Sequence, residues 1–273
     1  MADSFTLGVI GVGNMGAALV RGILRAGALP PQQITIADPD VGKTSALAGE
    51  LGMHVSADNA QLVGSSEYVV IAVKPNTVGA VMKEISGSLA SQQSLVSIAA
   101  GVTLSSLSGR LPQGISPALI RVMPNTPALV GAGAMAVAPG PGATEDRVEK
   151  LTQLLRALGE VVVVDETLMD AVTGLSGSGP AFVFVMVEAL ADAGVAAGLP
   201  RPVALKLAAQ TVYGAGKLVV ESGQHPGALK EMVASPGGTT IAGLAELEKA
   251  GFRGAVLSAV KAAANRSREL SRG

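Results

Sequence analysis

Two glycine-rich turns lie near opposite ends of the 273-residue chain, and each has residue types that can hold an anion. The turn Ser-Pro-Gly-Gly-Thr-Thr, residues 235–240, precedes an Ala/Leu/Glu-rich run that predicts a helix over 240–250. The first N–H groups of a helix have no intrahelical partner and carry the positive end of its dipole, so this turn can hold a small carboxylate without an arginine. The same residues also suit a plain helix–helix connection with an N-cap.

The second turn is Gly-Val-Gly-Asn-Met-Gly, residues 11–16. It follows a predicted strand over 5–11 and opens a predicted helix over 14–26, the context in which this pattern is typical of dinucleotide binding. The first glycine makes the tight turn, the second lets the backbone approach a pyrophosphate, and the third permits close packing of helix on strand. We therefore predict a nicotinamide dinucleotide at this turn.

Asp38 ends the next predicted strand, residues 34–38, roughly 20 residues after the glycine turn. A carboxylate at this spacing binds the ribose 2′-hydroxyl of NAD and repels the 2′-phosphate of NADP. No arginine follows closely, and Lys43 is the nearest cation. These residues favour NADH over NADPH, although Asp38 also suits a turn-capping role together with Pro39 and Asp40.

Composition excludes several classes of function. The chain has no Cys and only two His, which excludes disulfides, thiolate nucleophiles and Cys-based or multi-His metal sites, so no metal is expected. A net charge of -1 without a long basic run argues against nucleic-acid binding. The apolar run 181–187 is broken by Glu188, far short of the roughly 20 residues that span a membrane. With no secretory signal at the N-terminus, we expect a cytoplasmic protein whose excess apolar residues serve a subunit interface.

Short apolar runs alternate with helical segments in the first part of the chain, which predicts a doubly wound α/β domain with a mainly parallel sheet. The expected strands are residues 5–11, 34–38, 68–73, 95–100, 119–123, 134–138 and 161–164. Beyond residue 179 glycine and proline residues mark only helix ends. The expected helices are residues 181–197, 202–222, 227–233, 240–250 and 252–270. We therefore predict a Rossmann domain over 1–165 and an all-helical domain over 166–273, whose first helix is apolar nearly all round and suits a dimer interface.

Four further stretches complete one pattern. They are AVKPNTV at 72–78, RVMPNTPALVGAG at 121–133, TGLSGSGPAF at 173–182 and SPGGTTIAGL at 235–244. Together with GVGNMG they strongly resemble the pyrroline-5-carboxylate reductase family. The resemblance covers essentially the whole chain, and SPGGTT, MPNTP and LSGSGPAF are specific to that family, whereas GVGNMG is shared with many dehydrogenases.

The resemblance implies reduction of (S)-1-pyrroline-5-carboxylate to L-proline by NADH or NADPH, the last step of proline biosynthesis. It also implies a C-terminal helical dimerisation domain, dimers that often assemble further into decamers, and active sites completed partly by the neighbouring subunit. A reductase of another cyclic imine and a non-catalytic NAD(P)-binding regulator remain as alternatives. A β-hydroxyacid dehydrogenase does not fit, because residues 173–190 hold neither the Lys nor the Asn that such enzymes use there.

The resemblance also carries site residues over to this chain. Together with Asp38, the cofactor-binding positions are Gly11, Gly13, Asn14, Met15, Gly16, Asn59, Ala72, Val73, Lys74, Pro75, Ala99 and Gly101. The substrate-binding positions are Gly238, Thr239, Thr240 and Glu166. One departure is Gly223, where some family members carry an acidic residue that can reach the substrate amine; Glu221 lies nearby in the sequence.

The implied chemistry needs few side chains. A cyclic imine is basic enough to be substantially protonated near neutral pH, and the protonated form is already a good electrophile. Thr240 is the candidate catalytic residue, since its hydroxyl can hydrogen-bond the ring nitrogen while the N–H groups of the turn hold the carboxylate. Catalysis is then mainly positioning and desolvation. Among other polar residues, His225 suits a capping role, Lys74 contributes chiefly its backbone, and Arg121 suits a tie between the MPNTP loop and the sheet.

Overall fold

The computed structural model describes residues 6–271 and divides them into two compact units. The first unit holds residues 6–178 together with 262–271, and the second holds residues 179–261. The last helix therefore begins in the second unit and ends in the first. The predicted domain boundary between residues 165 and 166 stays a prediction, because these units reflect contacts within a single copy of the chain.

An eight-stranded sheet forms the centre of the first unit, in the order β3-β2-β1-β4-β5-β6-β7-β8. The strands are β1 Leu7–Ile10, β2 Ile34–Ala37, β3 His54–Val55, β4 Tyr68–Ile71, β5 Ser94–Ser97, β6 Ala118–Met123, β7 Gly133–Pro139 and β8 Gly159–Val163. All neighbouring pairs are parallel except β6 with β7. The predicted doubly wound, mainly parallel sheet is confirmed. The two-residue strand β3 is too short for any pattern to predict it.

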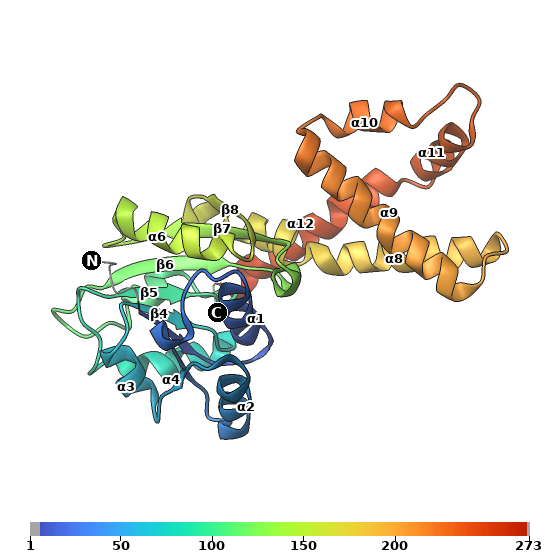
Figure 1. The fold of residues 1–273 in the computed structure, drawn as a ribbon. Helices are drawn as coiled ribbons and strands as arrows, with labels where there is room; N and C mark the ends of the chain where they lie inside the picture. The colour runs from blue at the N-terminus through green and yellow to red at the C-terminus, as the bar shows by residue number, and fades with distance from the viewer. Residues whose placement is uncertain (1–5, 272–273) are drawn as a thin grey trace. The chain divides into compact units, whose positions relative to one another are not determined.

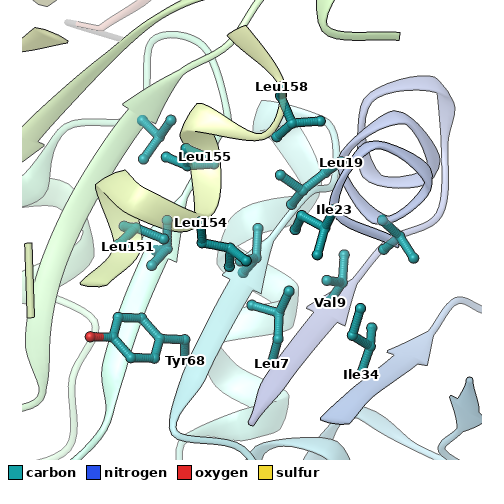
Figure 2. Close-up of a cluster of buried hydrophobic side chains, with 14 of the residues drawn as sticks. Leu7, Val9, Leu19, Ile23, Ile34, Tyr68, Leu151, Leu154, Leu155 and Leu158 are labelled. Atoms are coloured by element: carbon teal, nitrogen blue, oxygen red, sulfur yellow. The ribbon is translucent and has the colours of Figure 1, made fainter. Parts of the chain in front are cut away.

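Helices cover both faces of this sheet, which is why its strands are apolar on both sides (Figure 1). Side chains of α1 (Asn14–Arg25), α2 (Val41–Leu51) and α6 (Glu145–Arg156) join one core cluster. Those of α3 (Asn59–Gly64), α4 (Pro75–Ile85) and α5 (Leu104–Ser108) join the other. Figure 2 shows the first cluster, in which leucines of α6 and Leu19 and Ile23 of α1 pack over β1. Two further short 3-10 helices are η1 (Pro31–Gln33) and η2 (Thr126–Val130).

The order of the strands reverses at β1, which lies between β2 and β4. In an open parallel sheet, ligands bind outside the carboxyl ends of the strands at such a switch point. Here the Gly11 N–H donates to the Ala37 carbonyl at 2.8 Å, and the Ala72 N–H donates to the Ile10 carbonyl at 2.8 Å. These hydrogen bonds bring the glycine turn, the end of β2 and the AVKPN segment to one edge of the sheet.

Helical turns follow one another from Glu166 to Ala196. They are the 3-10 helix η3 Glu166–Leu168, α7 Met169–Val172, the π-helix η4 Thr173–Gly177 and α8 Gly179–Ala196. By length and composition this stretch, in which a window of 18 residues has a mean hydropathy of 1.5, is long and apolar enough to cross a membrane. The shorter run 181–187 does not predict such a span, because Glu188 interrupts it. A single stretch of this kind is weak evidence for a membrane span, because packed helices of soluble proteins pass the same test.

The second unit is all-helical, and the five predicted helices are confirmed. After α8 they are α9 Arg201–Ser222, α10 Pro226–Met232, α11 Thr239–Lys249 and α12 Phe252–Leu270. Helices α8 and α9 approach closely through small residues: a Cβ on Gly194 would lie 3.1 Å from the Cβ of Ala204. Proline at the first or second position starts α9 and α10, and glycines at positive φ end α8, α9 and α11.

This unit buries little apolar surface by itself. Within residues 179–261 the buried apolar residues are Ala191, Ala204, Ala208 and Leu229. Large side chains remain at the surface of α8, with Phe184 63% and Val185 64% exposed. An apolar surface of this extent marks an interaction site in a soluble protein. The second unit therefore needs a further apolar surface to complete its core.

Candidate cofactor and substrate sites

The three glycines of the GVGNMG turn have different packing environments. Gly11 has φ +97°, and a Cβ there would lie 2.8 Å from the Ala72 carbonyl oxygen. A Cβ on Gly16 would overlap the Gly11 carbonyl oxygen, so α1 can approach the turn this closely only with glycine. By contrast, no described atom lies within 4 Å of a Cβ built on Gly13. The middle glycine therefore faces open space, as the backbone of a pyrophosphate-binding turn requires.

The first turn of α1 provides the positive end of this site. Gly13 is the N-cap, and no side chain among residues 6–271 caps the helix. The N–H groups of Asn14, Met15 and Gly16 belong to the set that has no intrahelical partner. Such a terminus binds phosphate, so the predicted position of the pyrophosphate fits the local structure.

A cavity of about 570 Å³ opens at this edge of the sheet. Its lining is Ile10, Gly11, Gly13, Ala37, Asp38, Pro39, Ser56, Ala57, Asp58, Asn59, Ala72, Val73, Lys74, Thr77, Ala80, Val81 and Glu84. Seven of the predicted cofactor residues thus lie together: Gly11, Gly13, Asp38, Asn59, Ala72, Val73 and Lys74. The volume is typical of small-molecule sites, and the residues present fit the adenosine and phosphate part of a dinucleotide.

Asp38 is held by two backbone donors. Its Oδ2 accepts the Val12 N–H at 2.8 Å, and its Oδ1 accepts the Asp40 N–H at 2.9 Å. The carboxylate therefore joins the glycine turn to the start of the next loop, in addition to lining the cavity. Each oxygen keeps a lone pair that can accept a ribose hydroxyl.

Ten cavity residues lie outside the predicted set, among them Ser56, Ala57, Asp58, Thr77 and Glu84. Asp58 caps α3, and its Oδ1 accepts the Gln61 N–H at 2.7 Å. The neighbouring Asn59 donates from Nδ2 to Glu84 Oε2 at 2.8 Å, which links α3 to α4. The helix-capping pattern at Asp58 could have identified this side of the cavity from the sequence. It was not recognised, because the strand before it is only two residues long.

The remaining predicted cofactor residues lie around this cavity or at the next strand. Pro75 is the first residue of α4, after the exposed N-cap Lys74. Ala99 and Gly101 follow β5; Ala99 is buried, and Gly101 has φ +75° beside Leu270 of α12. The roles of these residues, and those of Asn14, Met15 and Gly16, stay predictions.

The SPGGTT turn lies in the second unit and opens α11. Gly237 has φ +68°, Gly238 is the N-cap, and the Gly238 N–H donates to the Ser235 carbonyl at 3.0 Å. The positive φ of Gly237 favours glycine there, while a Cβ on Gly238 would require the Ser235 hydroxyl to move. No side chain caps α11 within the described residues, which leaves its first N–H groups available for an anion. Thr240 is half-buried in the first turn.

Glu166 has protein partners in the first unit. Its Oε1 accepts the Leu104 N–H at 2.6 Å and lies 3.4 Å from Nη1 of Arg121, which is 3% exposed. Arg121 therefore pairs with Glu166, and the expectation that it ties the MPNTP loop to the sheet is wrong. That loop is tied by Asn125, whose Oδ1 accepts the Ala134 N–H and whose Nδ2 donates to the Ser176 carbonyl, each at 3.0 Å.

The hydrogen bond from Asn125 to the Ser176 carbonyl therefore joins the MPNTP motif to the LSGSG motif, which lies in a π-helix. Ser176 belongs to η4, where the wider helical turns change which carbonyls are bonded within the helix. Gly177 leaves room for Met123, because a Cβ there would lie 2.6 Å from the Met123 Cε.

His225 has the predicted capping role: its Nδ1 accepts the Gly227 N–H at 3.0 Å at the start of α10.

Comparison with known proteins agrees with this arrangement. Residues 6–101 match the family model described as NADP oxidoreductase, coenzyme F420-dependent, and residues 166–270 match pyrroline-5-carboxylate reductase dimerisation. Over 270 residues the chain is 47% identical to the pyrroline-5-carboxylate reductase of Arabidopsis thaliana, covering 99% of this chain and 97% of that protein. The chain belongs to the pyrroline-5-carboxylate reductase family.

Two solved pyrroline-5-carboxylate reductase structures share the fold over nearly the full length. The enzyme from Coxiella burnetii is 33% identical with a TM-score of 0.93, covering 98% of this chain and 99% of that one. The Plasmodium falciparum pyrroline carboxylate reductase with NADP bound is 32% identical with a TM-score of 0.87, covering 98% of both chains. The predicted family and fold are confirmed, and the exposed apolar surface of α8 falls within the matched dimerisation region.

The glycine turn of this reductase can be tested with two matched variants. Gly16→Ala is expected to lower Tm, because its Cβ would overlap the Gly11 carbonyl oxygen. Gly13→Ala should keep Tm within about 2 °C of wild type but weaken NADH binding by about 10-fold, since its methyl group occupies the pyrophosphate approach. Thermal unfolding and NADH fluorescence titration measure the two effects. Wild-type NADH affinity in Gly13→Ala would contradict the assignment.

Proposed function

We propose that this chain reduces (S)-1-pyrroline-5-carboxylate to L-proline with a reduced nicotinamide dinucleotide, in the last step of proline biosynthesis. The observation that carries the proposal is the 47% identity over almost the whole length of a plant pyrroline-5-carboxylate reductase. The cavity at the β1/β4 switch point supports it independently, because its glycine turn and helix N-terminus suit a pyrophosphate.

The first unit holds the cofactor in this proposal. Gly11, Gly13 and the N–H groups that open α1 bind the pyrophosphate, while Asp38 and Asn59 face the adenosine half. The segment after β4, from Ala72 to Pro75, and the segment with Ala99 and Gly101 lie toward the nicotinamide. When bound, the reduced nicotinamide supplies the hydride that the carbon of the C=N bond accepts.

The start of α11 holds the substrate. The free N–H groups after Gly238 bind the carboxylate, supported by the helix dipole. The Thr240 hydroxyl hydrogen-bonds the ring nitrogen and fixes its protonation state. Such a site works by positioning two reactants, so it needs neither a thiolate nor a metal ion.

We also propose that NADH is preferred over NADPH. Three carboxylates line the cavity, Asp38, Asp58 and Glu84, against the single ammonium of Lys74. The other nearby cation, Lys43, is paired with Asp40 at 3.1 Å, and the hydrogen bond from Lys43 lowers the pKa of the Asp40 carboxyl. Among the described lining residues three carboxylates therefore outnumber the one ammonium, so a 2′-phosphate beside Asp38 would meet a net negative surface.

The assembly proposed is a homodimer through the C-terminal helices, with dimers that join into a decamer, in the cytoplasm. The exposed apolar residues of α8 support a dimer, because a second copy offers a matching surface. The same contact would cover the helical stretch that is long enough to cross a membrane. Light scattering of the purified protein gives the number of subunits.

Steady-state oxidation of NADH and NADPH with pyrroline-5-carboxylate tests the reaction and the cofactor preference together. Wild type is expected to turn over with NADH at the higher kcat/KM. Asp38→Ser should raise the NADPH-to-NADH ratio of kcat/KM by about 10- to 100-fold, because one like-charge contact of about 1–3 kcal/mol is removed. Glu149→Gln, which removes an exposed charge on α6, is the control and should leave the ratio unchanged.

A folded wild-type sample that binds NADH but reduces no pyrroline-5-carboxylate would reject the proposed substrate. Activity on another cyclic imine would then identify a related reductase, and no activity on any imine would favour a non-catalytic NAD(P)-binding protein. An unchanged cofactor ratio in Asp38→Ser would reject the role of Asp38 alone.

The role of Thr240 is tested by removing its hydroxyl with little change of shape. Thr240→Val is expected to lower kcat/KM for pyrroline-5-carboxylate by about 10- to 1000-fold, the range for one oriented hydrogen bond at a reacting group. Thr240→Ser keeps the hydroxyl and should stay within about 5-fold of wild type. Equal kinetics of the valine variant and wild type would remove Thr240 from the mechanism.

The dimer surface is tested by placing a charge on α8. Phe184→Glu is expected to give a monomer in light scattering at micromolar concentration, because an unpaired carboxylate would be buried at the interface. Activity should fall with it if the neighbouring subunit completes the site. Val41→Glu adds the same charge at an exposed position of the first unit, which is 70% exposed, and should keep the wild-type mass. A dimer that persists in Phe184→Glu would place the interface elsewhere.

A further inference from the structure

The ion pair between the buried Arg121 and the half-buried Glu166 is not explained by the cofactor cavity or the substrate turn. Arg121 lies on β6 and is 3% exposed, and its Nη1 lies 3.4 Å from Oε1 of Glu166. Within residues 6–271 its Nη2 atom is buried and has no hydrogen-bond partner. A buried guanidinium is unfavourable unless its N–H groups have acceptors, so the acceptor oxygen of Glu166 is needed where it is.

This pair lies against the segment 98–103, which leaves the carboxyl end of β5. Arg121 is in register with Ser97, the last residue of β5. At the other end of the segment, Glu166 Oε1 accepts the Leu104 N–H at 2.6 Å. The backbone of Arg121 thus lies beside the start of the segment in the sheet, and the Glu166 carboxylate holds its end through a hydrogen bond.

The outer side of the same segment is held by the end of α12. Gly101 has φ +75°, and a Cβ there would lie 3.3 Å from the Cβ of Leu270. Three residues earlier on that helix, Ser267 Oγ donates to Asp170 Oδ1 at 2.7 Å, which anchors the helix end to α7.

We infer that Arg121 and Glu166 form one positioning unit for the segment 98–103, and that Glu166 acts through this segment instead of contacting the substrate. The inference rests on the proposed function, which puts Ala99 and Gly101 on the nicotinamide side. Glu166 Oε1 is shared by two donors, and its charge is balanced by Arg121. Loss of the carboxylate would therefore release the Leu104 N–H and the buried guanidinium together, and move the segment.

Three variants separate positioning from substrate contact. Glu166→Ala is expected to lower kcat by about 10- to 100-fold, because a small displacement at the nicotinamide side misaligns the reactants. Glu166→Gln should recover to within about 5-fold of wild type, since an amide oxygen can still accept both hydrogen bonds. Asp165→Asn, on the neighbouring exposed carboxylate, is the control and should match wild type. In all three, KM for pyrroline-5-carboxylate should change by less than about 3-fold.

Two binding measurements do not depend on turnover. The Kd of ADP-ribose should be the same in wild type and Glu166→Ala, because the adenosine cavity is lined by other residues. The fluorescence change of NADH on binding should be smaller in Glu166→Ala and restored in Glu166→Gln, because it reports the surroundings of the nicotinamide. A wild type that reduces no pyrroline-5-carboxylate would sink the proposed function, while these two measurements would still decide the role of Glu166.

The partner residue gives a second test. Arg121→Lys should lower kcat by a similar factor, and adding Glu166→Ala to it should lower kcat by less than a further about 3-fold, because residues that act as a unit are not additive. The inference is overturned if Glu166→Gln behaves like Glu166→Ala and both raise KM for the substrate. It is also overturned if ADP-ribose binding weakens in Glu166→Ala, which indicates general loss of structure.

Discussion

The structure depends on the close approach of backbone at the β1/β4 switch point. Gly16 must lie against the Gly11 carbonyl oxygen for α1 to pack on the sheet, and Gly11 must turn beside Ala72. That packing brings Leu19 and Ile23 of α1 into the core over β1 (Figure 2). Because the helix starts at this contact, its unpaired N–H groups point to the same edge where the parallel strands end. The cofactor site is therefore a consequence of how the first helix packs.

The elements with a strong local signal could be predicted from the sequence. Proline and glycine residues punctuate the helical half, so the five predicted helices agree with the structure to within about two residues at each end. The strands buried on both faces are continuous apolar runs, and their alternation with helices is typical of a doubly wound sheet. Strand β3 has only two residues and carries no such signal. The antiparallel direction of β7 depends on the turn after β6, which apolar patterning does not specify.

The local structure of the candidate sites was predictable where a backbone conformation requires a residue type. The glycines of GVGNMG fit their packing, and the SPGGTT turn opens a helix as expected. Contacts between side chains far apart in the sequence were not predictable from local pattern. The pair of Arg121 and Glu166 spans 45 residues, and the hydrogen bond from Asn125 to the Ser176 carbonyl spans 51. The family resemblance identifies motifs at both contacts, but it does not show which residues touch, because the spacing of motifs along the chain does not encode tertiary contacts.

The two units differ in how much apolar surface each buries within one chain, and this difference bears on catalysis. The first unit has a core on each face of the sheet, and residues next to the glycine turn belong to both cores. The second unit buries few apolar residues within one copy, yet it carries the SPGGTT turn, which is the proposed substrate site. If a second copy supplies the missing apolar surface, the geometry of Gly238 and Thr240 depends on that association. Substrate binding would then be coupled to assembly, whereas dinucleotide binding would not, because the glycine turn is complete in a single chain.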